Sequence, residues 1–195
     1  MLISKTETGI SSTFGGRRKV VAYTFGHGTA DEARLAALIR AAAIESVVDV
    51  RSVPKSRRHP HVWAERMAHW IPELSGARYA WRPELGGFRK PIAGSRNVAL
   101  RHPAFRGYAD YMQSAAFAQA LDALVHEAAL RRTAVMCSES LWWRCHRRLI
   151  ADALTAGRGV EVRHLFHDGS SRPHLLTPGA RLLPDGTLRY DAVEE

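Results

Sequence analysis

The second half of the chain carries the stretch Thr133-Ala134-Val135-Met136-Cys137-Ser138-Glu139-Ser140-Leu141-Trp142-Trp143-Arg144-Cys145-His146-Arg147. Its first four residues form a short apolar run, which is typical of a buried strand, and a helical pattern over residues 144–156 follows. The connection and the start of this helix hold both cysteines of the chain, together with a carboxylate, a histidine and arginines. Ionisable groups are rarely gathered at the end of a buried strand without a use. The stretch therefore predicts a strand–loop–helix unit that carries a chemical site.

The rest of the chain continues this alternation of strands and helices. Short apolar runs predict further strands over residues 20–25, 46–50, 77–81 and 160–165. Amphipathic patterns predict further helices over residues 31–43, 62–71, 105–112 and 117–130, and Pro72 is expected to end the second of them. Residues 83–102 show no helical or strand-like hydrophobic period, which predicts a long surface loop. The pattern of residues 181–190 predicts a short strand or hairpin.

This order of elements predicts an α/β fold. We expect a central, mostly parallel five-stranded sheet with helices on both faces, in Rossmann-like or flavodoxin-like layering. A chain of 195 residues with 46% hydrophobic and 24% charged residues is long enough for one packed domain and ordinary in composition. We therefore expect a single α/β domain over residues 20–195, preceded by a polar N-terminal extension over residues 1–19.

Three polar segments follow predicted strands and are expected to meet. In open parallel sheets, ligands bind beyond the carboxyl ends of the strands. That edge would carry His27 between two glycines, Asp49 with Arg51, and Cys137 with Glu139. Loops from separate parts of the sequence would then converge, and the sequence predicts a pocket at this edge.

The same segments belong to a series of short motifs along the chain. In order they are Thr24-Phe25-Gly26-His27-Gly28, Val48-Asp49-Val50-Arg51-Ser52-Val53-Pro54-Lys55-Ser56-Arg57-Arg58-His59-Pro60, Glu84-Leu85-Gly86-Gly87, Tyr108-Ala109-Asp110-Tyr111-Met112, Met136-Cys137-Ser138-Glu139, Cys145-His146-Arg147 and His174-Leu175-Leu176-Thr177-Pro178-Gly179-Ala180-Arg181. The series resembles the domain of unknown function 488 family over about residues 20–181. The resemblance implies a compact α/β domain and names no activity. Two positions depart from it: Phe25 stands where the family usually has isoleucine, and Ser138 where it often has alanine.

Cysteine chemistry is the first hypothesis for the site. Cys145 lies near the predicted start of a helix, beside His146 and Arg147, and helix N-termini and cations both favour a thiolate over a thiol. Cys137 is the alternative nucleophile, with Cys145 resolving a disulfide. The alternative is that both cysteines are buried and purely structural, because free cysteine packs as a small apolar residue. The first arginine after Cys137 is Arg144, one position too far for the Cys-x5-Arg loop of cysteine phosphatases.

Two other readings of the cluster stay open. Cys137, Glu139, Cys145 and His146, with His27, are of ligand types that bind metal, although their spacing is unlike that of a structural zinc site. Without thiol chemistry, Glu139 could form an ion network with Arg51 and Arg147 around a bound anion. Asp49 and Glu139 could also act as paired carboxylates on a glycosidic bond.

The charge of the chain suggests a polyanion as partner. The formal net charge is +9, and only four of the 28 Lys and Arg residues are lysine. Arginine grips phosphate in two places, although codon usage in a GC-rich genome would also enrich it. The loop with Arg57 and Arg58 is basic and Trp63 follows it, a mixture that suits nucleic acid. No helix-turn-helix, zinc-finger or RNA-recognition signature is present.

These observations favour an enzyme that acts on an anionic substrate, a nucleotide or nucleic acid. The expected catalytic residues are Cys137, Glu139, Cys145, His146 and Asp49, and the expected anion-binding residues are His27, Arg51, Arg57, Arg58 and Arg147. The alternatives are a non-enzymatic nucleic-acid-binding module and a metal-binding or thiol-redox protein. No apolar run is long enough to span a bilayer and the N-terminus has no secretory pattern, so we expect a cytoplasmic protein without a membrane partner. The sequence indicates no particular cofactor or oligomeric state.

Overall fold

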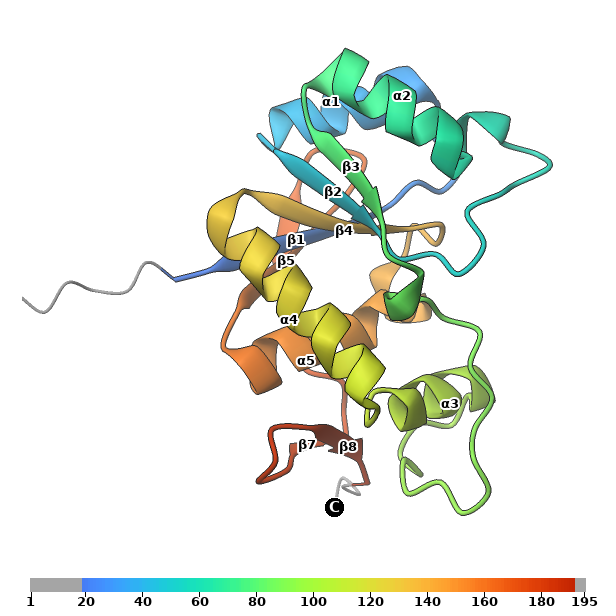
Figure 1. Cartoon of the computed structure of the whole chain (residues 1–195), viewed down its shortest axis with the longest axis vertical. Helices are drawn as coiled ribbons and strands as arrows, with labels where there is room; N and C mark the ends of the chain where they lie inside the picture. Colours follow the sequence, from blue (N-terminus) through green and yellow to red (C-terminus); the bar gives the residue numbers. More distant parts are fainter. Residues whose placement is uncertain (1–18, 192–195) are drawn as a thin grey trace, which may run out of the picture.

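A computed structural model describes residues 19–191, which form an α/β fold with a six-stranded central sheet (Figure 1). The strand order is β3-β2-β4-β1-β5-β6, and every pairing is parallel except that of β5 with β6. The strands are β1 (Val21–Gly26), β2 (Ser46–Asp49), β3 (Arg78–Trp81), β4 (Thr133–Cys137), β5 (Glu161–Leu165) and β6 (Ser171–Pro173). The predicted α/β class and mostly parallel sheet are therefore confirmed.

The central strands are buried on both faces, which explains their unbroken apolar sequences. Every residue of β2 and β4 is buried, as are five of the six in β1. In β4 the side chains alternate between two cores: Ala134 and Met136 face one, and Val135 and Cys137 face the other. This alternation places Cys137 on the same side of the sheet as the helix that follows it.

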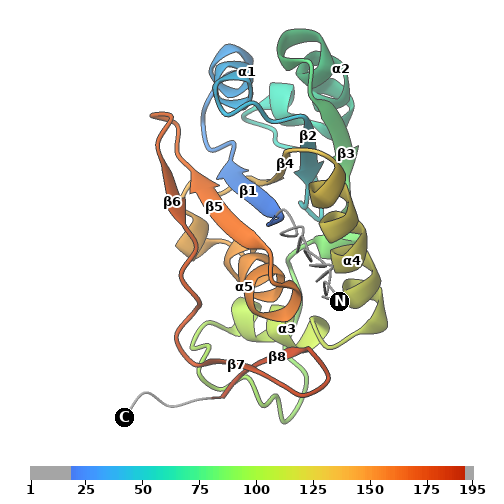
Figure 2. The ribbon, with the colours of Figure 1, turned by 90° about the vertical axis from the view of Figure 1, so that its left-hand side faces the viewer.

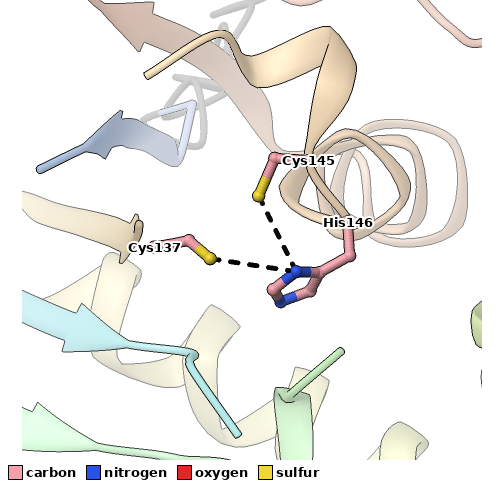
Figure 3. Close-up of side chains that lie close together, drawn as sticks. All are labelled: Cys137, Cys145 and His146. Atoms are coloured by element: carbon pink, nitrogen blue, oxygen red, sulfur yellow. Dashed lines mark hydrogen bonds between the residues drawn. The ribbon is translucent and has the colours of Figure 1, made fainter. Parts of the chain in front are cut away.

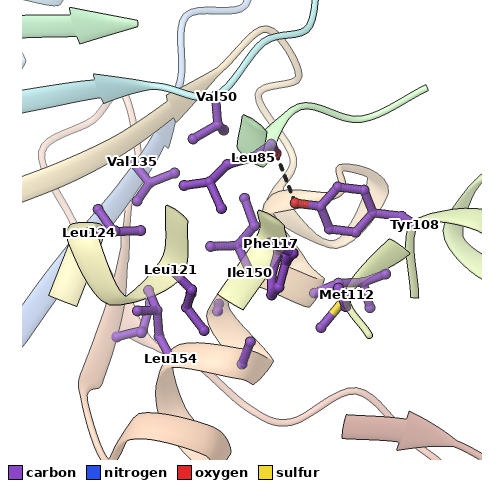
Figure 4. Packing of buried hydrophobic residues seen from close by; sticks show 14 of the residues in the cluster. Val50, Leu85, Tyr108, Met112, Phe117, Leu121, Leu124, Val135, Ile150 and Leu154 are labelled. Carbon is purple, nitrogen blue, oxygen red and sulfur yellow. Dashed lines mark hydrogen bonds between the residues drawn. The ribbon is translucent and has the colours of Figure 1, made fainter. Parts of the chain in front are cut away.

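Helices cover both faces of the sheet, as predicted (Figure 2). One layer comprises α1 (Glu32–Ala41) and α2 (Ala64–Ser75), and the other comprises α3 (Pro103–Tyr111), α4 (Ala115–Leu130) and α5 (Arg147–Arg158). Figure 4 shows the second core, where Leu121, Leu124, Ile150 and Leu154 pack against Val135. Burial of such side chains contributes about 1.5–3 kcal/mol each relative to exposure, so this face is a main source of stability.

The sheet has one strand more than the five predicted. The sixth strand, β6, is an antiparallel edge of three residues that ends in Pro173. It lacks an apolar run, and proline is tolerated at an edge strand, so the usual strand signal is absent. The predicted hairpin over residues 181–190 is confirmed as β7 (Ala180–Leu182) and β8 (Leu188–Tyr190), which form a separate two-stranded sheet.

Two predicted helix boundaries were wrong. Helix α2 continues past Pro72 to Ser75 and ends at Gly76, whose left-handed backbone closes the helix. Pro72 lies in the last turn, and the buried Trp70 and Ile71 hold this part of the helix on the sheet. Helix α5 starts at Arg147 rather than at residue 144, because the short 3-10 turn η3 (Trp142–Arg144) comes first.

The connections diverge at the centre of the sheet. Strands β1 and β4 are neighbours, but α1 leads from β1 over one face to β2, whereas α5 leads from β4 over the other face to β5. Such a switch point leaves a crevice at the carboxyl ends of the two strands. The loops after β1 and β4 are those that the sequence assigns to a pocket.

The predicted polar extension over residues 1–19 lies outside the described residues except for Lys19, which pairs with Glu161 at 3.2 Å. No helix within residues 19–191 has both the length and the apolar character needed to cross a membrane.

Candidate active site

A cavity of about 800 Å³ opens at the switch point of the sheet. The loops that follow β1, β2 and β4 line it with His27, Arg51 and Cys137. The segment between η2 (Pro83–Leu85) and α3 contributes Gly87 and Phe88. The three polar segments that the sequence assigns to one edge thus surround one pocket.

Two thiols and an imidazole lie together in this pocket (Figure 3). The Sγ atoms of Cys137 and Cys145 lie 3.9 Å and 3.7 Å from Nδ1 of His146. Cys137 ends β4, whereas Cys145 has an extended backbone just before the first turn of α5. The late start of α5 therefore turns Cys145 toward Cys137 instead of fixing it within the helix.

The ring of His146 is oriented by groups on three sides. Its Nε2 lies 3.2 Å from the carbonyl oxygen of Val50, and because a carbonyl only accepts, Nε2 is the protonated nitrogen. A Cβ added to Gly87 would lie 3.1 Å from Nδ1, and the ring of Tyr108 packs at 5.1 Å between centroids. In the neutral ring Nδ1 is then an acceptor that faces both sulfurs, which is the position of a base.

Arg147 brings a buried positive charge to Cys145. Its side chain is 1% exposed, and Nε donates to Sγ of Cys145 at 3.5 Å. Within residues 19–191, no carboxylate lies at ion-pair distance from this guanidinium. A buried cation needs a compensating anion nearby. A thiolate at Cys145 is the anion that the contacts of Arg147 favour.

The surroundings of the two thiols move their pKa values apart. The pKa of Cys145 is well below that of a free thiol because Cys137 donates a hydrogen bond to it and Arg147 and His146 add to the effect, while burial opposes it. The pKa of Cys137 is well above its ordinary value because the same hydrogen bond holds its proton and burial disfavours its charge. The first proton of the pair therefore leaves Cys145.

Asp49 and Arg51 form a buried ion pair that supports the pocket. The carboxylate of Asp49 receives Nε and Nη2 of Arg51 at 2.9 Å and 2.6 Å, and the hydroxyl of Tyr79 at 2.6 Å. Burial and then Asp49 raise the pKa of Tyr79 above its usual range, so Tyr79 stays a donor. All three groups are occupied by one another, which gives Asp49 a positioning role at the end of β2.

His27 is held neutral beside this pair. Arg51 donates from Nη1 to Nε2 of His27 at 3.2 Å, and Nδ1 of His27 donates to the carbonyl oxygen of Gly28 at 2.9 Å. Burial and the charge of Arg51 lower the pKa of His27 to about 4. His27 therefore accepts a hydrogen bond at neutral pH and carries no charge for an anion.

The protein is expected to lose stability as the pH falls from about 6.5 toward 4. His27 takes up a proton in the unfolded chain over this range but not in the folded one, so unfolding is favoured as pH falls, and the full contribution is present above pH 6.5. His27→Gln keeps an acceptor for Arg51 but cannot titrate. In this variant the free energy of unfolding should fall less between pH 6.5 and pH 4, by on the order of 2 kcal/mol. Urea denaturation at a series of pH values measures it.

A matched control is His69→Gln. The side chain of His69 is 81% exposed and lies outside the pocket, so its replacement should leave the pH dependence that His27 causes in place. An identical pH dependence in the wild type and in His27→Gln would show that His27 is not held neutral.

Glycine allows the loops after β1 and β4 to touch. A Cβ on Gly26 would lie 1.9 Å from the carbonyl oxygen of Glu139, which no side chain can accommodate. The contact continues through backbone bonds of 2.9 Å from His27 to Cys137 and from Gly28 to Ser138. Close approach of the backbones thus explains why glycine flanks His27.

The structure brings most of the predicted site residues together but separates two. Cys137, Cys145, His146 and Arg147 form one cluster, and Asp49, Arg51 and His27 form a second network. Arg147 and Asp49 do not line the pocket themselves but contact residues that do. Glu139 lines the pocket, and its carboxylate accepts from the backbone of Leu141 at 3.2 Å. Arg57 and Arg58 are exposed on the loop after β2 and do not line the cavity.

Several pocket residues were not predicted as site residues. Among them are the cations Lys55 and Arg144 and the aromatic residues Phe88, Trp143 and Tyr108. They stand in basic loops or family motifs whose sequence does not indicate which side chains face a cavity. The donor set for a metal is also smaller than expected: the Cys137, Cys145 and His146 ligand atoms lie within 4.8 Å of one another, but His27 and Glu139 do not join them.

Fold and site define an α/β protein with a cysteine–histidine–arginine cluster at the switch point of a parallel sheet. A model of the family described as domain of unknown function DUF488 matches residues 32–154, and the chain belongs to this family. The resemblance in the motifs is confirmed, although the match is shorter than the expected span of residues 20–181. A search of curated proteins and a search of solved structures found no match.

Proposed function

We propose that this protein is a cytoplasmic enzyme that acts on an anionic substrate, a nucleotide or nucleic-acid strand, through the thiolate of Cys145. The observation that carries the proposal is the place of the Cys145 Sγ in the pocket, between Nδ1 of His146 and Nε of Arg147. A nucleophile, a base within reach and a cation that stabilises the charged sulfur are the parts that nucleophilic catalysis requires. The ordinary alternative, a packed structural thiol, does not account for the buried cation.

The chemistry follows from these contacts. Nδ1 of His146 accepts the proton of Cys145, and the Arg147 guanidinium stabilises the resulting thiolate. Sγ then forms a bond to the electrophilic atom of the substrate as the bond from that atom to the leaving group breaks. The leaving group takes the electron pair of that bond and the proton held on His146. Water later cleaves the bond to sulfur and restores the thiol.

The charge of the pocket supports an anionic substrate. Lys55 and Arg144 line the cavity and are exposed, while Glu139 is the acidic residue in its lining. Arg144 and Lys55, whose ammonium lies 4.0 Å from the exposed carboxylate of Glu65, outnumber the one carboxylate in the lining and attract phosphate groups to the pocket. The nucleophile would then work next to the site where the phosphate is held.

Aromatic side chains in the same pocket support a nucleotide. Phe88 is 90% exposed and has φ of 58°, and Trp143 is 44% exposed. A phenylalanine with a left-handed backbone costs about 1–3 kcal/mol, and such strain clusters at ligand sites. An aromatic ring that a strained backbone holds in an exposed position is suited to stacking on a base while the neighbouring cations bind phosphate.

The experiment compares two double variants that each remove two cations. Lys55→Met with Arg144→Met changes the pocket, whereas Arg57→Met with Arg58→Met changes the loop outside it. The probe is a dye-labelled single-stranded oligothymidylate, followed by fluorescence anisotropy, with thymidine monophosphate and inorganic phosphate as competitors. We expect the pocket variant to bind at least about tenfold more weakly, because two phosphate contacts are lost, and the loop variant to bind normally.

Turnover is followed by mass spectrometry of the oligonucleotide and of nucleoside monophosphates incubated with the protein. A product formed by the wild type and absent with Cys145→Ser supports the enzyme. Loss of affinity only in the loop variant, without turnover, would instead identify a nucleic-acid-binding module. A tightly bound metal ion in the purified protein, found by elemental analysis, would overturn the free thiolate, because three ligands of the right types lie together here.

A further inference from the structure

A chain of buried polar side chains runs from Arg147 away from the pocket. Nη1 of Arg147 contacts Oγ1 of Thr24 at 3.4 Å, and this hydroxyl lies 2.7 Å from Nδ1 of His164. Nε2 of His164 lies 3.0 Å from Nδ1 of His174, whose Nε2 lies 2.8 Å from Oδ1 of Asp152. These five residues come from β1, β5, α5 and the segment after β6, and all of them are buried.

One pattern of protons satisfies every link. The carboxylate of Asp152 only accepts, so Nε2 of His174 donates to it. With one proton on each imidazole, Nδ1 of His174 accepts from Nε2 of His164, and burial, followed by the neighbouring His174 and Arg147, lowers the pKa of His164 to about 3. Nδ1 of His164 accepts the proton of the Thr24 hydroxyl, whose oxygen is left to accept from Arg147. Every donor in the chain therefore points toward Asp152.

Asp152, at the far end of this series of hydrogen bonds, is firmly held. Asp152 also receives the backbone N–H of Thr177 at 2.9 Å and the hydroxyl of Tyr190 at 2.9 Å. Trp142 stacks on His164, with ring centroids 4.1 Å apart and planes within 5°. A chain of hydrogen bonds with fixed ends restricts the orientation of each member, and its bonds strengthen one another at low dielectric.

Arg147 is the group that this chain would orient. Nη2 donates to the carbonyl of Glu139, Nη1 to Thr24, and Nε to Cys145. With the first two nitrogens fixed, the third has a single direction, toward the sulfur. Loss of the Thr24 contact would free the guanidinium to turn away from Cys145.

We propose that Thr24, His164, His174 and Asp152 form a relay that fixes Arg147 against Cys145, which makes these four residues positioning residues of the site. The inference rests on the proposed function, in which Cys145 is the nucleophile. The mechanism there does not use these residues, and three of them lie outside the stretch that the family model matches.

The test is the pH midpoint of alkylation of Cys145 by iodoacetamide, resolved from that of Cys137 by peptide mass spectrometry. The ionisable groups that face Cys145 are Cys137, His146, Arg147 and Tyr108, and the variants leave all four in place. Thr24→Val removes the hydroxyl without changing any charge. We expect it to raise the midpoint by about one pH unit, because Arg147 no longer holds the thiolate.

A neighbouring threonine offers the control. Thr133 is fully buried in β4, and its hydroxyl donates to the carbonyl of Arg131 rather than to the relay. Thr133→Val therefore makes the same chemical change and should leave the midpoint unaltered. Thr24→Ser restores the hydroxyl and should restore the wild-type midpoint, which a merely structural role of Thr24 does not require.

His174→Leu breaks the relay two links further on. We expect the midpoint to rise in the same direction as in Thr24→Val, with thermal unfolding recorded to confirm that the variant folds. If His174→Leu does not fold, Thr24→Val and Thr24→Ser still decide the question. If Thr24→Val has the same midpoint as the wild type, the relay is overturned but the thiolate at Cys145 is not. If the wild-type protein itself has the midpoint of a free thiol, both the proposed function and the relay are overturned.

Discussion

Replacing Cys145 with serine is expected to slow the reaction of this protein with iodoacetamide at pH 6 by about tenfold or more. The reason is the lowered pKa of Cys145, which keeps the thiolate populated at a pH where an ordinary thiol is protonated. Reactivity should fall only as the pH drops through this lowered pKa. The measurement is the rate of alkylation under native conditions, followed by the mass of the intact protein.

Cys137→Ser is the matched control. It removes the other thiol of the pair but keeps a hydroxyl that can donate to the thiolate, so most of the fast reaction should remain. The opposite result, with the fast reaction lost in Cys137→Ser and kept in Cys145→Ser, would assign the nucleophile to Cys137. Equal rates in both variants and in the wild type would mean that neither thiol is activated.

Asp49→Ala is expected to lower the free energy of unfolding by about 3–5 kcal/mol. The substitution leaves Arg51 buried without its carboxylate and removes the acceptor of the Tyr79 hydroxyl. A loss of this size is a large part of the stability of a typical domain, so much of the protein should be unfolded at 37 °C. Chemical denaturation at pH 7 measures the effect.

Asp122→Ala provides the comparison. Asp122 pairs with Arg158 at 2.7 Å, but its side chain is 62% exposed, and exposed ion pairs contribute about 0–1 kcal/mol. A loss below about 1 kcal/mol in both variants would show that Asp49 is not the structural anchor of the loop after β2. It would then regain the catalytic role that the sequence suggests.

The fold was largely predictable because its signals are local. The central strands have continuous apolar sequences, since both of their faces are covered, and the rule for parallel sheets places their loops at one edge. The antiparallel strand β6 was not predicted because its three residues end in a proline and carry no apolar run. The start of α5 was misplaced because the helical pattern extends back through the turn that precedes it.

The candidate site was predictable in part, and the reason is distance along the chain. Cys137, Cys145 and His146 stand within ten residues of one another, so their clustering is visible in the sequence. The contact between Thr24 and His164 joins residues 140 positions apart, and although Thr24 begins a family motif, nothing in the sequence links it to His164. The exposure and left-handed backbone of Phe88 likewise arise only when the loop is folded over the pocket edge.

The most direct test of the thiolate at Cys145 is its ultraviolet absorbance near 240 nm during a pH titration of the folded protein. The wild type and Cys137→Ser should each show one thiolate forming well below the pH at which a free thiol ionises, about 8.5, and Cys145→Ser should lack this step. A wild-type titration with no thiolate below that pH would contradict the account. Retention of the early step in Cys145→Ser would contradict it equally.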